Sequence, residues 1–437
     1  MSPRALAALL SLALAGCGSG AESPVSPTEE TGECATSGQV GFVRDTLREM
    51  YFWYSELPDP DPASFASPEA YLEAVRFRPL DASYSYITTK AASDAFFSDS
   101  QFIGLGIAYL QTGDAELRVA QVFPDGSAAE AGLRRGDYLV EVGGRSVVEL
   151  LQTGGLGAAF GPDEVGVTVA LAWRTPSGER QAAVLAKRLV TIPTVSATAV
   201  FDVAGARVGY VFFRNFVRPS HEALDSAFAE LAGQGVTDLV LDLRYNGGGL
   251  VDVAQHLASL IGGSGTAGEV FLAFRHNDKN AHRDTSLLFE DSVGALDLPR
   301  LVVIQAGGSA SASEAVVNGL RPFMPVTTVG DRSFGKPVGQ YGFEFCEKVL
   351  YPVAFVVANA RDEADYFDGI AADCPAVDDL DRPIADPDEG SLAAALFFLR
   401  TGRCRAAAAG EAELRARRRA AGKPFAGDPW RQLVGAY

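Results

Sequence analysis

Histidine is scarce in this sequence, and its scarcity limits the chemistry available to the chain. Only four of the 437 residues are histidines, and they are scattered: His221, His256, His276 and His282. A Ser–His–Asp triad or a histidine-based metal site therefore has little support. The cysteines show neither a CxxC motif nor a cysteine–histidine spacing typical of zinc sites. We expect no metal and no other cofactor.

An excess of basic side chains is also missing. The chain has 37 Lys and Arg against 55 Asp and Glu, which gives a formal net charge of −18. Because nucleic acids bind to basic surfaces, we do not expect a nucleic-acid partner. The basic stretch Arg415–Arg419 is more typical of a solvated helix face than of a binding patch. An apolar fraction of 47% indicates a folded protein, and the length allows two or three domains.

Long apolar runs are absent except at the N-terminus. Ala5–Ala15 is apolar apart from Ser11, and Leu14-Ala15-Gly16-Cys17 closes the run. The run is too short to span a bilayer and fits a cleavable signal peptide over residues 1–16. Its end resembles a bacterial lipobox, which implies that Cys17 is acylated and becomes the mature N-terminus. The alternative is a simple signal peptide with a chance cysteine at the boundary.

A lipid anchor implies a place in the bacterial cell envelope, facing the periplasm or the cell exterior, with the membrane as a partner. Residues 17–35 are rich in Gly, Ser, Pro, Thr and Glu, a composition typical of a flexible tether. No other segment has 18 uninterrupted apolar residues. We therefore expect no membrane-spanning helix.

Export also changes the interpretation of the other cysteines. An even number of cysteines in an oxidising compartment predicts disulfides. The four are Cys34, Cys346, Cys374 and Cys404. Three pairings are possible, and the sequence alone does not choose among them. We favour Cys346–Cys374, because that bond closes a short loop.

The apolar pattern divides the rest of the chain into four parts. Residues 36–99 look helical and aromatic. Residues 100–190 contain short alternating runs between glycine turns, which predicts a β-rich module. Residues 191–402 alternate strands with helices, which predicts a mostly parallel sheet covered by helices, and residues 403–437 form a C-terminal tail. The expected fold class is α/β, or α+β when the whole multidomain chain is considered.

Three motifs follow predicted strands of this alternating part, where ligands usually bind in such sheets. Asp242–Gly249 reads DLRYNGGG and ends in three glycines, and Gly307–Glu314 reads GGSASASE and opens a helix. Ser333–Lys336 reads SFGK, and Gln340 stands four residues after the lysine. Each motif alone has a simpler interpretation, as a tight turn, a serine N-cap and a surface lysine respectively.

Taken together, the order and spacing of these motifs resemble the C-terminal processing (tail-specific) serine proteases. In that family the nucleophile is the first serine of the final Ser-Ala-Ser-Glu, here Ser311, and its lysine partner lies 25 residues later, here Lys336. A glutamine four residues beyond the lysine supports it in many members, and Gln340 occupies that place. The resemblance covers about residues 40–400 and includes Trp53–Pro58 and Asp81–Tyr86 near the N-terminus.

The resemblance implies a PDZ module at residues 100–190 and a crotonase- and ClpP-like α/β catalytic core. Gly104-Leu105-Gly106-Ile107 looks like the carboxylate-binding loop of that module, which implies capture of a peptide C-terminus by strand addition. Backbone N–H groups of Gly247 or Gly248 and of Ala312 would form the oxyanion hole.

The sequence departs from the family at three places. Some members have an aspartate eleven residues after the serine, where this chain has Pro322, so we assign no acid a catalytic role. Pro337 follows the lysine where glycine is common. The long region Phe343–Cys374 is not shared by all members, so substrate preference is not carried over.

Two functions remain open at this point. The first is a serine endopeptidase with a Ser–Lys dyad that cleaves exported or envelope proteins, near free C-termini captured by the PDZ module. There Ser311 attacks the peptide carbonyl and neutral Lys336 acts as general base. The second is a lipid-anchored peptide-binding protein whose active site is inactive. The intact Ser311, Lys336, Gln340 and glycine motif favour the peptidase.

Overall fold

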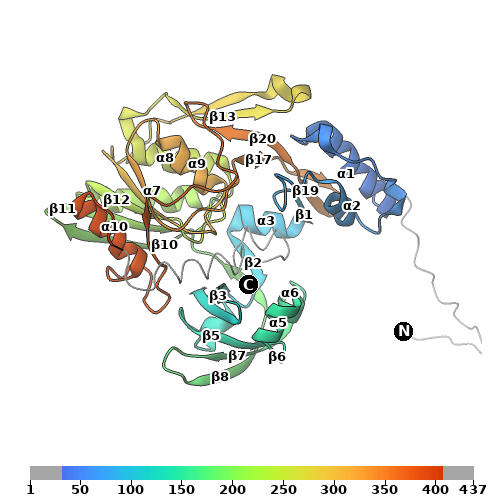
Figure 1. Ribbon diagram of the computed structural model, residues 1–437, viewed down its shortest axis with the longest axis horizontal. Helices are drawn as coiled ribbons and strands as arrows, with labels where there is room; N and C mark the ends of the chain where they lie inside the picture. Colours follow the sequence, from blue (N-terminus) through green and yellow to red (C-terminus); the bar gives the residue numbers. More distant parts are fainter. Residues whose placement is uncertain (1–31, 407–437) are drawn as a thin grey trace, which may run out of the picture.

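The computed structural model describes residues 32–406 of the chain. The predicted signal peptide, Cys17, most of the tether and the basic stretch Arg415–Arg419 lie outside the described residues. Within residues 32–406, no helix combines the length and the apolar character that crossing a bilayer requires. Figure 1 shows three regions, in which the N-terminal helices and a β-rich module adjoin a larger α/β core.

The core is a six-stranded sheet in the order β10-β11-β12-β15-β16-β21. All neighbouring pairs from β11 to β21 are parallel, and only β10 is antiparallel to its neighbour. This arrangement confirms the predicted, mostly parallel sheet. The strands are β10 (Val195–Val203), β11 (Ala206–Phe213), β12 (Asp238–Asp242), β15 (Leu301–Gln305), β16 (Val326–Gly330) and β21 (Cys374–Pro375).

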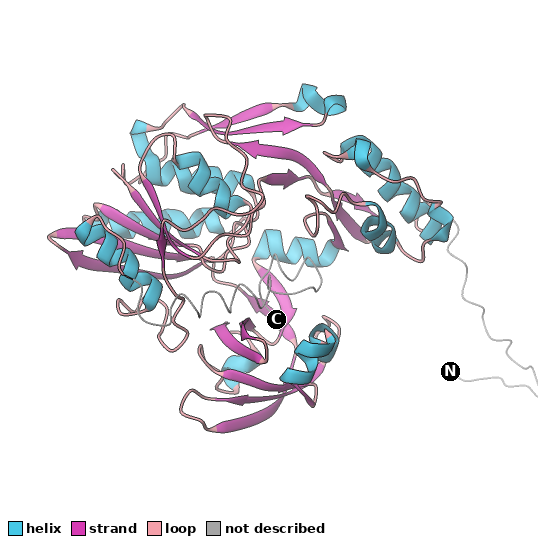
Figure 2. Cartoon of the chain, in the orientation of Figure 1, coloured by secondary structure: helices cyan, strands magenta, loops and turns pink. Residues whose placement is uncertain are grey.

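Helices cover both faces of this sheet, so its central strands are apolar on both sides. Alternate residues of β12 point to opposite faces: Leu239 and Leu241 pack in one cluster with α7, α8 and α9, whereas Val240 packs in another with α10. Figure 2 shows these helices around the sheet. The helices are α7 (Ser220–Gly233), α8 (Val251–Gly262), α9 (Ala312–Leu320) and α10 (Gly390–Thr401).

Two smaller sheets join the core to the N-terminal region. The first has the order β14-β13-β20-β17 and the second β1-β19-β18. Their strands are β13 (Val270–His276), β14 (Thr285–Leu288), β17 (Val338–Gln340) and β20 (Val353–Ala358), then β1 (Tyr86–Thr89), β18 (Phe343–Phe345) and β19 (Lys348–Tyr351). Because β1 comes from the N-terminal region and β19 from the core, the two regions share a sheet.

The N-terminal region contains the predicted helices α1 (Thr36–Met50), α2 (Pro68–Val75) and α3 (Lys90–Asp99). Ser67 accepts a hydrogen bond from Ala70 N and is the N-cap of α2. Leu47 on α1 and Leu72 on α2 pack in one apolar cluster with Val338 and Val353 of the core. Much of this region's apolar surface is therefore buried only when the core is present.

The β-rich module comprises a short pair, β2-β9, and a larger sheet in the order β3-β4-β5-β7-β8, with β6 paired to β5. The strands are β2 (Gln101–Gly104), β3 (Ile107–Gly113), β4 (Glu116–Val122), β5 (Tyr138–Val142), β6 (Arg145–Ser146), β7 (Thr168–Arg174), β8 (Arg180–Ala186) and β9 (Arg188–Thr191). The helices are α4 (Ser127–Glu130), α5 (Val147–Thr153) and α6 (Leu156–Phe160). Strand β3 lies at one edge of the larger sheet, where β4 is its only neighbour among the described strands.

The cysteines form two disulfides, and the favoured Cys346–Cys374 bond is wrong. The bonds are Cys34–Cys346 and Cys374–Cys404, with Cα–Cα distances of 5.8 and 5.1 Å. Cys346 lies between β18 and β19, whereas Cys374 lies in β21 at the edge of the core sheet. A short loop in the sequence does not bring two cysteines together when its ends belong to different sheets, since a disulfide needs Cα atoms within about 7 Å.

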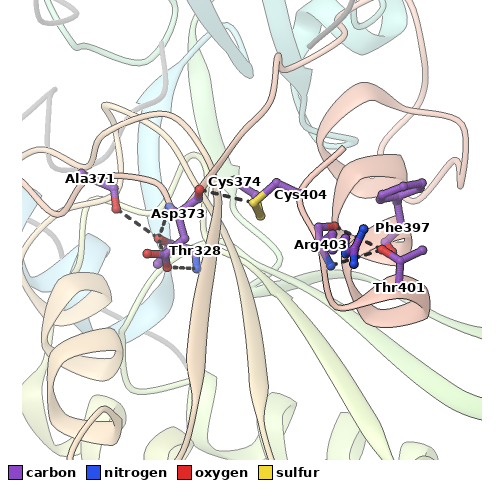
Figure 3. The surroundings of a disulfide bond; sticks show 8 residues. All are labelled: Thr328, Ala371, Asp373, Cys374, Phe397, Thr401, Arg403 and Cys404. Atoms are coloured by element: carbon purple, nitrogen blue, oxygen red, sulfur yellow. Dashed lines mark hydrogen bonds between the residues drawn. A yellow bond between two sulfur atoms is a disulfide. The ribbon is translucent and has the colours of Figure 1, made fainter. Parts of the chain in front are cut away.

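Each disulfide joins chain segments that are already neighbours in the fold. Cys34–Cys346 attaches the start of α1 to the turn between β18 and β19. Cys374–Cys404 attaches β21 to the segment after α10 (Figure 3). Next to it, Asp373 Oδ2 accepts hydrogen bonds from N and Oγ1 of Thr328 on β16.

Candidate active site

Two of the predicted motifs meet beyond the carboxyl ends of β12 and β15. The carbonyl of Asn246 accepts hydrogen bonds from Ala310 N at 3.1 Å and from Ser313 Oγ at 2.8 Å. Ser309 Oγ donates to Leu243 O at 2.7 Å. These bonds join the loop that ends in three glycines to the loop that opens α9.

Gly248 lets the glycine loop approach the candidate nucleophile. Its φ is +98°, and a Cβ atom there would lie 2.9 Å from both Ala312 N and Ser311 Cβ. No side chain is accommodated at such distances, so this approach requires glycine. The requirement explains the central glycine of the motif.

Ser311 lies immediately before α9 in an unusual backbone conformation. Its φ is +54° and its ψ is −114°, outside the regions that a residue with a Cβ normally adopts. Strain of this kind is common at functional sites, where the surrounding structure holds it in place. Here the holding contact is the hydrogen bond from Ser311 N to Glu314 Oε2 at 3.0 Å.

The predicted oxyanion donors differ in their availability. The N–H of Gly248 donates to Asn246 Oδ1 at 2.9 Å and is therefore already occupied. Within residues 32–406, the N–H groups of Gly247 and Ala312 donate to no hydrogen-bond acceptor. The N-terminus of α9, where Ala312 lies, also carries a partial positive charge that favours an anion. Of the three predicted donors, Gly247 and Ala312 are the two that remain free.

Lys336 and Gln340 lie together, as the sequence predicts. Lys336 Nζ is 2.5 Å from Gln340 Oε1, and Gln340 Nε2 donates to Tyr84 O and Tyr351 O, each at 2.7 Å. Burial lowers the pKa of Lys336 to about 8, although the charges of Asp81 and Glu314 act in the opposite direction. A substantial fraction of Lys336 is therefore neutral near pH 8.

Gly335 shapes the turn that presents this lysine. Its φ is +90°, and a Cβ atom there would lie 2.3 Å from Phe367 O and 2.5 Å from Gly369 N. Pro337, where the sequence departs from the family, lies directly before β17, and its carbonyl accepts a hydrogen bond from Val357 N at 2.9 Å.

Ser311 and Lys336 share no hydrogen bond in this structure, although both residues are described. Lys336 as a whole residue is partly exposed, but its amine lies in the buried environment that lowers its pKa, and there Nζ is bound to Gln340. The two segments are connected by a hydrogen bond from Phe334 N to Ser309 O at 2.9 Å and by Glu314, a residue whose role the sequence analysis did not assign. Its carboxylate is buried and accepts four hydrogen bonds from both segments.

The four donors to Glu314 come from two parts of the chain that are far apart in sequence. Oε2 accepts from Ser311 N at 3.0 Å and from Lys336 N at 2.8 Å. Oε1 accepts from Gly335 N at 2.7 Å and from Ser333 Oγ. Burial raises the pKa of Glu314, while these hydrogen bonds oppose the rise by stabilising its charged form. One carboxylate thus holds the backbones of both candidate catalytic residues.

The predicted carboxylate-binding loop, residues 104–107, connects β2 to β3. The carbonyls of Leu105 and Gly106 accept hydrogen bonds from Ala128 N and Phe123 N. Within the described part of the chain, the N–H groups of Leu105 and Gly106 donate to no acceptor. Free N–H groups beside an edge strand are the arrangement that a peptide C-terminus needs for strand addition.

The β-rich module also contacts the glycine loop of the core. Arg135 donates to the hydroxyl of Tyr245 at 2.7 Å and pairs with Asp378 at 2.6 Å. Arg244 pairs with Asp242, Asp378 and Glu389 in the same buried cluster. The loop that carries Gly247 therefore rests on an ion cluster to which the β-rich module contributes an arginine.

Models of known protein families match all three regions of the chain. Residues 207–374 match the model of peptidase family S41, residues 38–86 match the S41 N-terminal domain, and residues 118–160 match a PDZ domain. The β-rich module is therefore a PDZ domain, and the core has a peptidase scaffold. More narrowly, the chain belongs to peptidase family S41.

Relatives and solved structures agree with this assignment. The chain is 33% identical over 244 residues to the chloroplastic C-terminal processing peptidase of Tetradesmus obliquus, covering 54% of this chain and 51% of the relative. It is 26% identical over 285 residues to the carboxy-terminal-processing protease of Bartonella bacilliformis, covering 62% of each. The chain thus spans about half to three fifths of these relatives.

A solved structure extends the likeness of the fold. A Bacteroides fragilis protein, classed provisionally as an S41 protease, superposes with a TM-score of 0.65 at 24% identity. The match covers 82% of this chain and 96% of that one, so nearly the whole of that structure has the same arrangement.

Glu314→Gln is expected to lower kcat at least about tenfold on any substrate that the wild type cleaves. The glutamine amide has one oxygen, which accepts hydrogen bonds, and one NH2 group, which does not. The two donors that face the NH2 group therefore lose their acceptor. One such bond to a charged group contributes about 1.5–3 kcal/mol. The measurement is steady-state cleavage, with the melting temperature recorded in parallel.

Glu222→Gln provides the matched control, because Glu222 is exposed in the first turn of α7. It should leave both kcat and the melting temperature unchanged. An unchanged kcat in Glu314→Gln would show that the carboxylate does not hold the two segments in the arrangement that cleavage needs.

Proposed function

We propose that this chain is a serine endopeptidase with a Ser–Lys dyad, Ser311 as nucleophile and Lys336 as general base. The observation that carries the proposal is a lysine whose pKa is lowered to about 8 and whose backbone is held, through Glu314, to that of a serine at a helix N-terminus. A surface lysine has no such shift. A serine N-cap accounts for the capping-box bond from Ser311 N to Glu314, but it needs no further bond from Lys336 N to the same carboxylate.

The chemistry follows from the valence of a neutral amine. Neutral Nζ keeps one lone pair, which can accept the Ser311 hydroxyl proton while an N–H remains on Gln340 Oε1. As the proton moves to Nζ, Oγ forms a bond to the substrate carbonyl carbon, and the N–H groups of Gly247 and Ala312 stabilise the oxyanion. Lys336 then returns the proton to the leaving amine as the C–N bond breaks.

Water completes the cycle by hydrolysing the acyl-enzyme. Lys336 accepts a proton from the water, the water oxygen attacks the ester carbon, and the proton returns to Ser311 Oγ as the acid product leaves. We infer that substrates are exported or envelope proteins cut near their C-termini, with the PDZ domain binding the free end. The names of the relatives, which refer to C-terminal processing, support this substrate class.

Cleavage is expected to rise with pH through an apparent pKa of about 8 and to reach a plateau above it. The sign follows because only the neutral amine is a base, and its fraction grows as the pH approaches and passes the pKa of Lys336. Lys336→Arg should be nearly inactive at every pH, since arginine stays protonated. The measurement is kcat/KM between pH 6 and 10, with Ser311→Ala as the blank. Substantial activity in Lys336→Arg would exclude Lys336 as the base.

The second candidate is a lipid-anchored peptide-binding protein without catalysis, which the free N–H groups of the PDZ loop would also support. A fluorophosphonate label distinguishes the two functions. Labelling of Ser311 that is lost in Ser311→Ala and in Lys336→Arg supports the peptidase. Absence of labelling in the wild type favours the binding protein.

The PDZ domain is expected to bind peptides with a free C-terminus more tightly than their C-terminal amides. The N–H groups of Leu105 and Gly106 would donate to a carboxylate, and an amide presents neither its charge nor its second acceptor oxygen. We expect at least a tenfold weaker affinity for the amide, or about 1.4 kcal/mol. Calorimetry with Ser311→Ala avoids cleavage during the titration; equal affinities would exclude this loop as the carboxylate site.

We further propose that Cys17 carries a lipid that anchors the protein in the bacterial cell envelope, facing the periplasm or the exterior. The apolar run before it is too short to hold the chain in a bilayer by itself. Cys17→Ser should therefore move the protein from the membrane fraction to the soluble fraction. Fractionation identical to wild type would refute the anchor.

A further inference from the structure

The peptide group between Gly335 and Lys336 is held at both of its ends. Its N–H belongs to Lys336 and donates to Glu314 Oε2. Its carbonyl belongs to Gly335 and accepts a hydrogen bond from the hydroxyl of Tyr84. Because this peptide plane sets the direction of the Lys336 side chain, both contacts determine where Nζ points.

The far end of the lysine side chain depends on the same tyrosine. Gln340 Oε1 holds Nζ, and Gln340 Nε2 donates to the backbone carbonyl of Tyr84 at 2.7 Å. The centre of the Tyr84 ring lies 5.9 Å from Nζ, and the Tyr84 side chain is buried. Tyr84 thus contacts the peptide before Lys336, anchors the partner of its amine and shields that amine from water.

The segment that carries Tyr84 is fixed by buried hydrogen bonds to Asp81 and to the core. Asp81 Oδ1 accepts hydrogen bonds from Tyr84 N and Ser85 N, and Asp81 Oδ2 accepts from Tyr51 OH and Ser85 Oγ. Ser85 Oγ in turn accepts from Val353 N of the core at 3.0 Å. Segment 81–86 is therefore a rigid part of the site although it belongs to the N-terminal region.

We propose that Tyr84 is a positioning residue for Lys336, so that the N-terminal domain supplies part of the site that binds the general base. This proposal rests on the peptidase function proposed above. Tyr84 acts in two separable ways, through its hydroxyl on the Gly335 carbonyl and through its ring over the lysine side chain. Each has its own experimental signature.

Tyr84→Phe removes the hydroxyl and keeps the ring. It should lower kcat about tenfold with little change in KM, because the Gly335–Lys336 peptide is held at one end only. The pH at which the rate is half-maximal should stay that of the wild type. Tyr84→Ala also removes the ring and admits water, so it should shift the pH–rate profile to higher pH, toward the ordinary lysine pKa of about 10.4.

A second readout does not depend on cleavage. NMR titration of the full chain carrying [ε-13C]lysine reports the pKa of each amine directly, and the signal missing from Lys336→Arg identifies Lys336. Tyr84→Ala should raise this pKa, and Tyr84→Phe should leave it unchanged. Tyr71→Phe is the matched control, because Tyr71 is a buried tyrosine of the same region whose ring contacts Phe65. It should change neither kcat nor the pKa.

The outcomes of these experiments distinguish a failure of the Tyr84 proposal from a failure of the proposed peptidase function. A wild-type Lys336 pKa in Tyr84→Ala, or a kcat within twofold of wild type in Tyr84→Phe, would overturn the role of Tyr84. If Tyr84→Ala does not fold, the Tyr84→Phe rate decides. If the wild type shows no cleavage that depends on Ser311, the peptidase function fails, and the NMR titration still decides whether Tyr84 controls the environment of Lys336.

Discussion

The site depends on one buried carboxylate. Glu314 accepts hydrogen bonds from N–H groups of Ser311 and Lys336, which are 25 residues apart in sequence and lie in different loops, one before α9 and one between β16 and β17. A charge of this kind is stable in the interior only when its oxygens are fully hydrogen-bonded. The same requirement that stabilises Glu314 thus fixes the relative placement of Ser311 and Lys336, because any separation of the two segments would leave the carboxylate with too few donors.

The loops that carry the proposed oxyanion donors are likewise held by buried hydrogen bonds. The backbone carbonyl of Asn246 accepts hydrogen bonds from Ala310 N and Ser313 Oγ, and its side-chain oxygen accepts one from Gly248 N. This one residue of the loop after β12 therefore binds both its own loop and the segment after β15. Beneath this loop, Arg244 pairs with three carboxylates and Arg135 of the PDZ domain reaches Tyr245. Removing one partner from a buried ion cluster is costly, which makes this support stiff. The core and the PDZ domain therefore both contribute to the support of the glycine loop beside Ser311.

The sequence predicted the parts of this site that are local in the chain. The strands ending near Leu243 and Gln305 and the helix after Ser311 follow from apolar runs and small residues, and the family resemblance supplied Lys336 and Gln340. The sequence did not predict that β1 pairs with β19 or which cysteines are joined. It also did not predict that Glu314 accepts hydrogen bonds from the N–H groups of Gly335 and Lys336. These contacts link residues up to 312 positions apart, and no periodicity within a segment encodes its partner.

The buried carboxylates near Lys336 present an apparent conflict with its proposed role as a neutral base, because a nearby carboxylate favours protonated lysine. The structure resolves this conflict because the oxygens of both nearby carboxylates already accept hydrogen bonds from other donors. Four donors use both oxygens of Glu314, and four others use those of Asp81, so neither carboxylate is bound to Nζ. The partner of Nζ is instead the neutral oxygen of Gln340. The charges organise the backbone around the lysine, while its amine meets an uncharged acceptor and a tyrosine ring, and for that reason burial prevails and the pKa falls.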